Sequence, residues 1–278
     1  YFFDRAGGGY SRLIDRDGKD WISFHKEPLK EVPASAAAGF RGIPNSVFGK
    51  DNPDAGAGHP GFDQCESALA GGDTIRTVSK NGRWAWTWRF TETNAVFTME
   101  KAPAEVAWWF LYEGTIAGRW SPRTHYWGTD TGGPRHETTD SKRQLFEQWR
   151  WAYFGDDQSP RVLLVAQAEQ DELPDTLWLM GSTRAGLDAP DGMVVFGFGR
   201  GPGGNPQFRG AGQRFVLGLV EGSVKDAASH AQLAVVAGQW TPAAKSAARG
   251  PLRVHPTNPR YFADGSKNSD GSLRAVYL

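Results

Sequence analysis

The sequence predicts an all-β protein with one or two short helices late in the chain. Three observations carry this prediction. Aromatic residues alternate with others through a central stretch at residues 83–118, which is the period-two pattern of a β-strand. The chain contains 35 glycines and 17 prolines, which recur as breaks between apolar runs. In the second half these apolar runs follow one another at nearly regular spacing, as is typical of sandwiches and barrels.

The central stretch is expected to form the middle of the sandwich. Trp84, Trp86, Trp88 and Phe90 fall on one face of a strand, and we expect this face to be buried because large apolar surfaces are normally covered. The alternative is an aromatic platform that stacks on a ligand. Residues 106–113, VAWWFLYE, are apolar on both faces until the final glutamate, as expected of a strand that is covered on both sides.

The first quarter of the chain combines a hairpin with a long irregular stretch. Residues 10–25 indicate a strand, a turn at Asp17 and Gly18, and a second strand, since Asp-Gly is a strong hairpin signal. Residues 39–64 are rich in Gly, Pro, Asn and Asp, so no regular element is expected there. Loops of this length are uncommon in compact domains and are often functional. This stretch is therefore the first candidate for a binding site.

A second irregular stretch is expected at residues 114–144. It mixes aromatic, histidine and arginine residues with Gly and Pro. A sugar ring offers an apolar face to an aromatic side chain and hydroxyl groups to polar side chains, so this composition favours carbohydrate binding. The alternative is a surface loop that its aromatic residues pin to the core. Trp120 and Trp127 are the preferred stacking platforms.

Further strands and a helix are expected in the second half of the chain. The helix has Ser223 as its N-cap and ends at Gly238, and a second short helix starts at Thr241 and Pro242. Segment 197–205, GFGRGPGGN, lacks the lysine and the following helix of a nucleotide-binding loop, so we expect a turn between strands. The expected strands are 147–156, 161–170, 175–183, 192–200 and 213–222.

Composition argues against several classes of function. The 31 basic and 31 acidic residues cancel, so neither nucleic acid nor a membrane surface is an expected partner. No apolar run reaches the roughly 18 residues of a membrane helix. The six histidines show no metal-ligand spacing, so we expect no zinc site and no cofactor. A structural calcium ion stays open, with the candidate ligands Asp51, Asp54, Asp130, Asp156 and Asp157.

The tail of the chain differs in character from the rest. Segment 251–278, which contains RVHPTNPRYFADG and ends in AVYL, resembles the segment that leads into the first strand of apiosidase-like glycoside hydrolase barrels. The resemblance implies that residues 1–250 form a β-sandwich domain, and that residues 251–278 are a linker and the first strand of a following, truncated catalytic barrel. We therefore expect a fragment of a secreted or periplasmic bacterial enzyme that degrades polysaccharides.

A second resemblance begins in the first hairpin and continues through the first irregular stretch. The order RLIDRDGKDW, then FRGIPNSVFG, then GHPGF is similar to the aldose-epimerase-like family, also called galactose-mutarotase-like. The resemblance covers residues 10–222 and implies a two-layer β-supersandwich; a jelly-roll or lectin-like sandwich is the alternative. It also implies a catalytic role for His59. The chain departs from the family pattern by an inserted Pro60 and by lacking an arginine just after Phe62. The matching positions are Arg41, Gly42, Ile43, Pro44, His59, Gly61 and Phe62.

Glu113 and His59 form the first candidate pair of catalytic residues. Proton transfer on a sugar needs a general acid and a general base with pKa values near the working pH. Glu113 follows an apolar strand, so partial burial at the edge of a sheet is expected to raise its pKa. In the structural interpretation, Glu113 is instead an ion-pair partner of Arg119 or Arg41, and His59 bonds to backbone.

A lyase would use a second set of residues, in segment 114–144. His125 or Tyr126 would act as the base, and Arg123 or Arg135 would neutralise a uronate carboxylate, which arginine binds well. The candidate substrate-binding residues are Arg41, Asn45, Trp109, Arg119, Trp120, Arg123, Trp127, Arg135 and His136.

The leading functional hypothesis is a carbohydrate-recognising domain that presents a polysaccharide or oligosaccharide to the following catalytic barrel. Its basis is the combination of aromatic-rich polar loops with the hydrolase-like tail. The alternative is that the domain is itself a glycoside hydrolase, a polysaccharide lyase or a sugar epimerase. A third hypothesis is a purely structural domain that supports the barrel through its late helices.

Overall fold

Antiparallel β-strands make up most of the regular secondary structure that the computed structural model of the chain describes. The prediction of an all-β sandwich is confirmed. The described residues contain one α-helix, and it is too short and too polar to span a membrane. The structure describes residues 1–25, 38–49, 52–136, 144–181, 186–187, 189, 191–241, 253–254, 262–267 and 273–276.

The larger sheet of the sandwich has nine strands in the part of the chain that the structure describes. Their order across the sheet is β3-β4-β5-β6-β17-β12-β11-β8-β9, and every neighbouring pair is antiparallel. The strands are β3 (Cys65–Leu69), β4 (Thr74–Ser79), β5 (Ala85–Phe90), β6 (Ala95–Lys101), β8 (His125–Thr129), β9 (Gly132–Arg135), β11 (Trp151–Asp156), β12 (Arg161–Gln167) and β17 (Arg214–Glu221).

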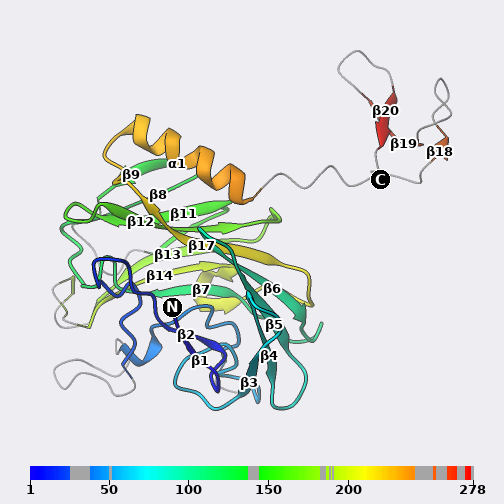
Figure 1. The fold of residues 1–278 in the computed structure, drawn as a ribbon, viewed down its shortest axis with the longest axis horizontal. Helices are drawn as coiled ribbons and strands as arrows, with labels where there is room; N and C mark the ends of the chain where they lie inside the picture. The colour runs from blue at the N-terminus through cyan, green and yellow to red at the C-terminus, as the bar shows by residue number, and fades with distance from the viewer. Residues whose placement is uncertain are drawn as a thin grey trace. The chain divides into compact units, whose positions relative to one another are not determined.

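The smaller sheet packs against one face of the larger sheet (Figure 1). Its described strands follow the order β10-β13-β14-β7 and are all antiparallel. The strands expected in the second half of the chain are present with shorter bounds, and β10 is an addition to them. The strands of this sheet are β7 (Phe110–Gly114), β10 (Gln144–Glu147), β13 (Asp175–Met180) and β14 (Met193–Phe198).

Aromatic side chains from both sheets fill the space between them. Phe110 of β7 stacks on Phe215 of β17 with ring centres 4.3 Å apart. Trp84, Trp86 and Trp88 are each 0% exposed, so the prediction that this aromatic face is core is confirmed. The period-two alternation alone predicted this result, because successive side chains of a strand point to opposite faces.

Helix α1 (Ala227–Trp240) covers the other face of the larger sheet, over β8, β9, β11 and β12 (Figure 1). The expected N-cap at Ser223 is wrong. Asp226 caps the helix instead, because its carboxylate accepts the backbone N–H of Ser229 at 2.8 Å and the Ser229 hydroxyl bonds back in a capping box. The helix also continues past Gly238. The second helix expected from Pro242 lies outside the described residues.

The expectation of an irregular stretch over residues 114–144 is wrong for β8 and β9. Glycines that look like chain breaks are strand positions here. A Cβ atom at Gly128 would lie 2.4 Å from the Tyr153 ring, and one at Gly155 would lie 2.2 Å from the Tyr126 ring. Two tyrosine rings therefore pack directly over neighbouring strand backbones, which only glycine allows.

Short hairpins complete the first unit of the chain. β1 (Phe2–Asp4) pairs with β2 (Gly9–Arg12), and the turn expected at Asp17 and Gly18 is present, with Gly18 at φ 80°. The second strand expected up to residue 25 is reduced to a bridge between Ile14 and Asp20. The turn expected at 197–205 is confirmed: β15 (Arg200–Gly201) and β16 (Asn205–Pro206) flank it.

The chain divides into two units, Tyr1–Thr241 and Pro242–Leu278. The domain boundary expected at residue 250 lies outside the described residues. The second unit holds a three-stranded antiparallel sheet of β18 (Arg253–Val254), β19 (Phe262–Lys267) and β20 (Leu273–Val276). Its assignment as the start of a catalytic barrel stays a prediction.

Candidate functional site

The first irregular stretch runs along the free edge of β7. The backbone N–H of Gly42 donates to the carbonyl oxygen of Glu113 at 2.7 Å, and the N–H of Glu113 donates back at 3.0 Å. Further along, the N–H of Trp109 donates to the carbonyl of Ser46 at 3.2 Å. Backbone pairing therefore holds residues 42–46 beside β7 and brings the two expected site segments together.

Glu113 lies on the face of β7 that points away from the aromatic core. Its neighbour Tyr112 is buried in the core, so strand alternation places the carboxyl group of Glu113 on the opposite face, where it is half-buried. Asn45 donates from Nδ2 to Oε2 of Glu113 at 2.5 Å and to the carbonyl of Phe40 at 2.9 Å. Both amide protons of Asn45 are therefore used, and Asn45 is a positioning residue for Glu113.

The carboxyl group of Glu113 is poised to exchange a proton near neutral pH. Burial raises the pKa of Glu113 to about 7, against the opposing effects of the Asn45 hydrogen bond and the positive charge of Arg200. An acid with this pKa can serve as a donor or as an acceptor at working pH. The raised pKa that the sequence predicted at the end of this strand is thus present in the structure.

Trp109 precedes Glu113 by four residues along the same extended segment and so lies on the same face of the smaller sheet. Its indole N–H donates to the carbonyl of Asn45 at 2.6 Å, and only 3% of its surface is exposed. Phe48 stacks on it with ring centres 5.5 Å apart and is 51% exposed. Phe48, rather than Trp109, is therefore the aromatic surface that a ligand can reach.

Arg200 also lies against Trp109, with its guanidinium carbon 5.5 Å from the ring centre. Burial lowers the pKa of Arg200, and the carboxylate of Glu113 opposes this shift. Among the described residues, neither a hydrogen bond nor an ion pair joins the guanidinium group to Glu113. Each of the two charges shifts the pKa of the other group, but the two side chains do not hydrogen-bond to each other.

A row of side chains crosses the smaller sheet from Glu113. Val195 of β14 is in register with Glu113, Trp178 of β13 is in register with Val195, and Gln144 of β10 is in register with Trp178. Residues in register on neighbouring strands lie on the same face of the sheet. Val195 is 1% exposed, so the row shows which residues share the face of Glu113 and not an open surface that continues to β10.

The structure does not bring His59 into contact with Glu113. The ring of His59 bonds through Nδ1 to the carbonyl of Pro60 at 3.1 Å and lies edge-on to Phe62. Burial lowers the pKa of His59 to about 4, so the ring is neutral at physiological pH. The inserted Pro60 packs against Gly42, where an added Cβ would lie 2.6 Å from the proline ring.

Arg41 is buried and joins two loops through its hydrogen bonds. Its guanidinium group donates to the carbonyls of Ser23 and Gly192, each at 2.9 Å, and lies 3.3 Å from the carboxylate of Asp191. These partners account for its role, and Glu113 is not one of them. The structural interpretation of Glu113 as an ion-pair partner of Arg41 or Arg119 does not describe this carboxyl group.

His125 and Arg119 belong to a separate cluster around Asp156. His125 Nε2 lies 3.5 Å from the Asp156 carboxylate, and both side chains are 1% exposed. Burial lowers the pKa of His125 to about 4, although Asp156 opposes the shift. Arg119 and Thr124 also donate to Asp156, at 3.3 and 2.8 Å. Buried from solvent, this histidine is poorly placed to act as a base on a polysaccharide.

The remaining candidates of segment 114–144 occupy several environments. The hydroxyl of Tyr126, 1% exposed, accepts the N–H of Val224 under α1. Trp127 is 4% exposed in the core, with the guanidinium carbon of Arg135 5.0 Å from its ring centre. These two aromatic residues are therefore not open stacking platforms.

Three further candidates lie near β8 and β9. Trp120 is half-buried and donates its indole N–H to the carbonyl of Leu187 at 2.7 Å. Arg123 is exposed in the turn before β8. His136 is exposed and lies 3.1 Å from the carboxylate of Asp157. The structure does not gather these residues around Glu113.

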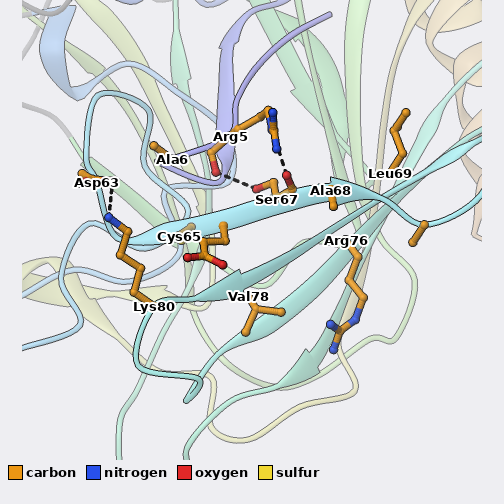
Figure 2. Close-up of a pocket in the computed structure, with 12 residues that line it drawn as sticks. Arg5, Ala6, Asp63, Cys65, Ser67, Ala68, Leu69, Arg76, Val78 and Lys80 are labelled. Atoms are coloured by element: carbon orange, nitrogen blue, oxygen red, sulfur yellow. Dashed lines mark hydrogen bonds and ion pairs between the residues drawn. The ribbon is translucent and has the colours of Figure 1, made fainter.

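A cavity of about 640 Å³ follows the edge strand β3 (Figure 2). Its charged residues are largely paired within the protein: Lys80 with Asp63 at 2.5 Å, and Arg76 with Glu100 at 3.0 Å. Arg5 donates to the backbone carbonyl of Ser67 at 3.0 Å, as Figure 2 shows. The chemistry of this cavity is mostly used internally, so the face around Glu113 is the stronger candidate.

The calcium candidates are not assembled into a site by the described residues. No group of three His, Cys, Asp or Glu side chains able to hold a metal ion occurs among them. Asp54 instead accepts the indole N–H of Trp84 and pairs with Arg83, each at 2.9 Å. Asp51 lies outside the described residues.

Sequence analysis missed two residues of the site, Phe48 and Arg200. Phe48 was visible as an isolated aromatic residue in a Gly- and Asn-rich loop. Arg200 lay inside the glycine-rich segment 197–205, which was interpreted only as a turn. An arginine held in a tight turn next to a strand end was the available signal.

Comparison with known proteins assigns no family to the chain. No protein-family model matches it, and no curated protein matches it. Five chains of solved structures match. One, described as "Crystal Structure Analysis of HI1317", has a TM-score of 0.49 and 12% identity, covering 78% of this chain and 87% of that one. The arrangement of the strands themselves defines an all-β sandwich, with a candidate site on the outer face of its smaller sheet.

Proposed function

We propose that this sandwich is a carbohydrate-recognising domain that binds a polysaccharide or oligosaccharide on the face around Glu113. The observation that carries the proposal is a half-buried Glu113 carboxyl oriented by Asn45, together with the exposed ring of Phe48 on Trp109, whose indole N–H bonds the carbonyl of the same Asn45. The ring supplies an apolar surface for the C–H face of a sugar. The free oxygen of Glu113 and the guanidinium group of Arg200 supply an acceptor and donors for hydroxyl groups.

The tail of the chain supports a place for this domain beside a catalytic barrel. Its likeness to the segment that leads into apiosidase-like barrels is the reason to propose a secreted or periplasmic enzyme that degrades polysaccharides. In that arrangement the domain holds the glycan, and the barrel cleaves it.

Binding to a panel of plant, algal and microbial polysaccharides tests the proposal. We expect retention of at least one polysaccharide in affinity electrophoresis, weakened about tenfold by Phe48→Ala through loss of the stacked ring. Phe2→Ala is the matched control, because Phe2 is 52% exposed on β1 and Phe48 is 51% exposed. Equal effects of the two substitutions, or no retention of any polysaccharide, would contradict the proposal.

A second candidate function, catalysis by this domain, is favoured by the raised pKa of Glu113. Glu113 would be the general acid or base, and His59 would take no part in the reaction. Mass spectrometry of products separates the classes: added water indicates a hydrolase, and unsaturated ends indicate a lyase. Polarimetry detects an epimerase. Glu113→Gln should abolish any such turnover while Glu66→Gln, on the edge strand β3, leaves it intact.

A further inference from the structure

Arg200 is held firmly in the site but its donors are not used. Nε and Nη1 are shielded from solvent and have no hydrogen-bond partner among the described residues. A guanidinium group carries five N–H donors, and leaving a buried donor unpaired destabilises the folded protein. The stack on Trp109 positions the group without satisfying it.

Arg161 shows what the same side chain looks like when the fold satisfies it. It donates to Glu221 at 2.8 Å and to Asp17 at 2.5 Å. Both arginines lie near a carboxyl group, but only Arg161 reaches one. Nε and Nη1 of Arg200 therefore lack an acceptor that the described residues could have supplied.

The backbone that carries Arg200 is closely constrained. Gly199 has φ 63° and lies under Phe208, where an added Cβ would be 2.6 Å from the ring. Arg200 itself pairs with Pro206. The backbone carbonyl of Arg200 accepts a hydrogen bond from the hydroxyl of Thr176 at 2.5 Å. Because this backbone is already fixed, the segment loses less conformational entropy when it binds a ligand.

The electrostatics of the site favour an anionic partner for this arginine. Glu113 is the carboxyl group that acts on Arg200, and its pKa of about 7 leaves a large fraction of it neutral at physiological pH. While Glu113 carries its proton, the positive charge of Arg200 lacks a local counter-charge among the described residues. A carboxylate or sulfate supplies both the charge and the acceptor oxygens.

We propose that the glycan bound at this site carries an acidic group, a carboxylate or a sulfate, and that Arg200 binds that group. The inference rests on the proposed carbohydrate recognition and narrows the substrate class to acidic polysaccharides. Arg200 receives the acidic group, Phe48 stacks on the ring, and Glu113 contacts a hydroxyl.

The test compares polysaccharides that differ only in the acidic group. The uronate probes are polygalacturonate and its carboxyl-reduced form; the sulfate probes are carrageenan and its desulfated form. We expect the protein to bind one acidic probe at least tenfold more tightly than its neutral counterpart, because a charge-assisted hydrogen bond contributes about 1.5–3 kcal/mol. Which pair shows the difference identifies the acidic group as a carboxylate or a sulfate.

Arg200→Gln should remove this preference, so that the acidic and neutral forms bind the variant with equal affinity. Arg209→Gln is the matched control, since it makes the same charge change at an exposed arginine that bonds only the backbone carbonyls of Ala104 and Glu105. Thermal melting checks that each variant folds. If Arg200→Gln does not fold, Arg200→Lys replaces it, with a partial loss expected because lysine keeps the charge without the fork of donors.

Each outcome decides between the two proposals. Equal binding of acidic and neutral forms leaves carbohydrate recognition intact and overturns the acidic inference. Equal losses in Arg200→Gln and Arg209→Gln also overturn it, because the preference then reflects overall charge. Binding of no polysaccharide overturns both proposals.

Discussion

Glu113 is half-buried and Asp156 is buried, and the two carboxyl groups differ in how many hydrogen bonds they accept. Asp156 accepts hydrogen bonds from Arg119, from Thr124 and from the backbone N–H of Gln158, and it is 0% exposed. Glu113 accepts one side-chain hydrogen bond, from Asn45, and keeps a surface open to solvent.

The two surroundings separate a carboxylate that the fold satisfies from one that keeps hydrogen-bonding capacity. Both groups lie at the ends of strands, and both have an arginine nearby. The arginine beside Asp156 donates to it, whereas the arginine beside Glu113 does not. A carboxylate that the fold has fully satisfied has no capacity left for a ligand, whereas Glu113 and Arg200 retain theirs.

Removing each carboxylate should have unequal effects on folding, and this is the largest effect that we predict. Asp156→Ala removes a buried acceptor that receives hydrogen bonds from Arg119, Thr124 and the backbone N–H of Gln158, so we expect a loss of about 3 kcal/mol in the free energy of unfolding. Urea denaturation measures it. Asp157→Ala, next in sequence but exposed, should lose less than about 1 kcal/mol. Similar losses in the two variants would remove the structural role given to Asp156.

Glu113→Gln should alter the pH dependence of stability. The pKa of Glu113 is raised in the folded protein from 4.5 to about 7, so the folded state binds a proton more tightly than the unfolded state does. Ionisation of this group therefore destabilises the wild type as pH rises from 4.5 to 7. Relative to wild type, the variant should gain about 2 kcal/mol between pH 4.5 and pH 8, discounting for the partial exposure of Glu113.

Urea titrations at pH 4.5, 6 and 8 measure this gain. Glu66→Gln is the control, because Glu66 is exposed on the edge strand β3. A stability difference between Glu113→Gln and wild type that stays constant over this range would show that the carboxyl group titrates normally.

The smallest predicted effect is on the titration of Glu113 itself. The hydrogen bond from Asn45 lowers the pKa of Glu113, so Asn45→Gly should raise it further. Glycine is chosen because residue 45 has φ 44°, which glycine adopts without strain. NMR titration of the glutamate side-chain carboxyl carbons measures the shift. Asn81→Gly, which removes a hydrogen bond to Asp54 instead, should leave Glu113 unchanged.

Much of the sandwich could be predicted from local patterns. The buried tryptophan face and the turn at Asp17 and Gly18 follow from alternation and from turn chemistry, which depend only on neighbouring residues. Strands β8 and β9 were not predicted, because Gly128 was interpreted as a chain break. Its role is to make room for the ring of Tyr153 on a neighbouring strand, and no local pattern records that contact.

The candidate site shows the same division. Glu113 and Asn45 were both predicted as site residues, but their contact spans 68 positions in the sequence and exists only because residues 42–46 pair with the edge of β7. His59, chosen by resemblance, is turned to Pro60 and Phe62 instead.

The amino-acid pattern was enough to predict the burial of the tryptophan face and most strands of the second half of the chain, because both follow from side-chain alternation along one segment. The hydrogen-bond partners of the charged groups were not predictable in this way. Arg161 finds its acceptors and Arg200 does not, since each depends on distant segments that meet it in space. Hydrogen-bond satisfaction is a property of the assembled fold, and for that reason the site around Glu113 and Arg200 emerged only in three dimensions.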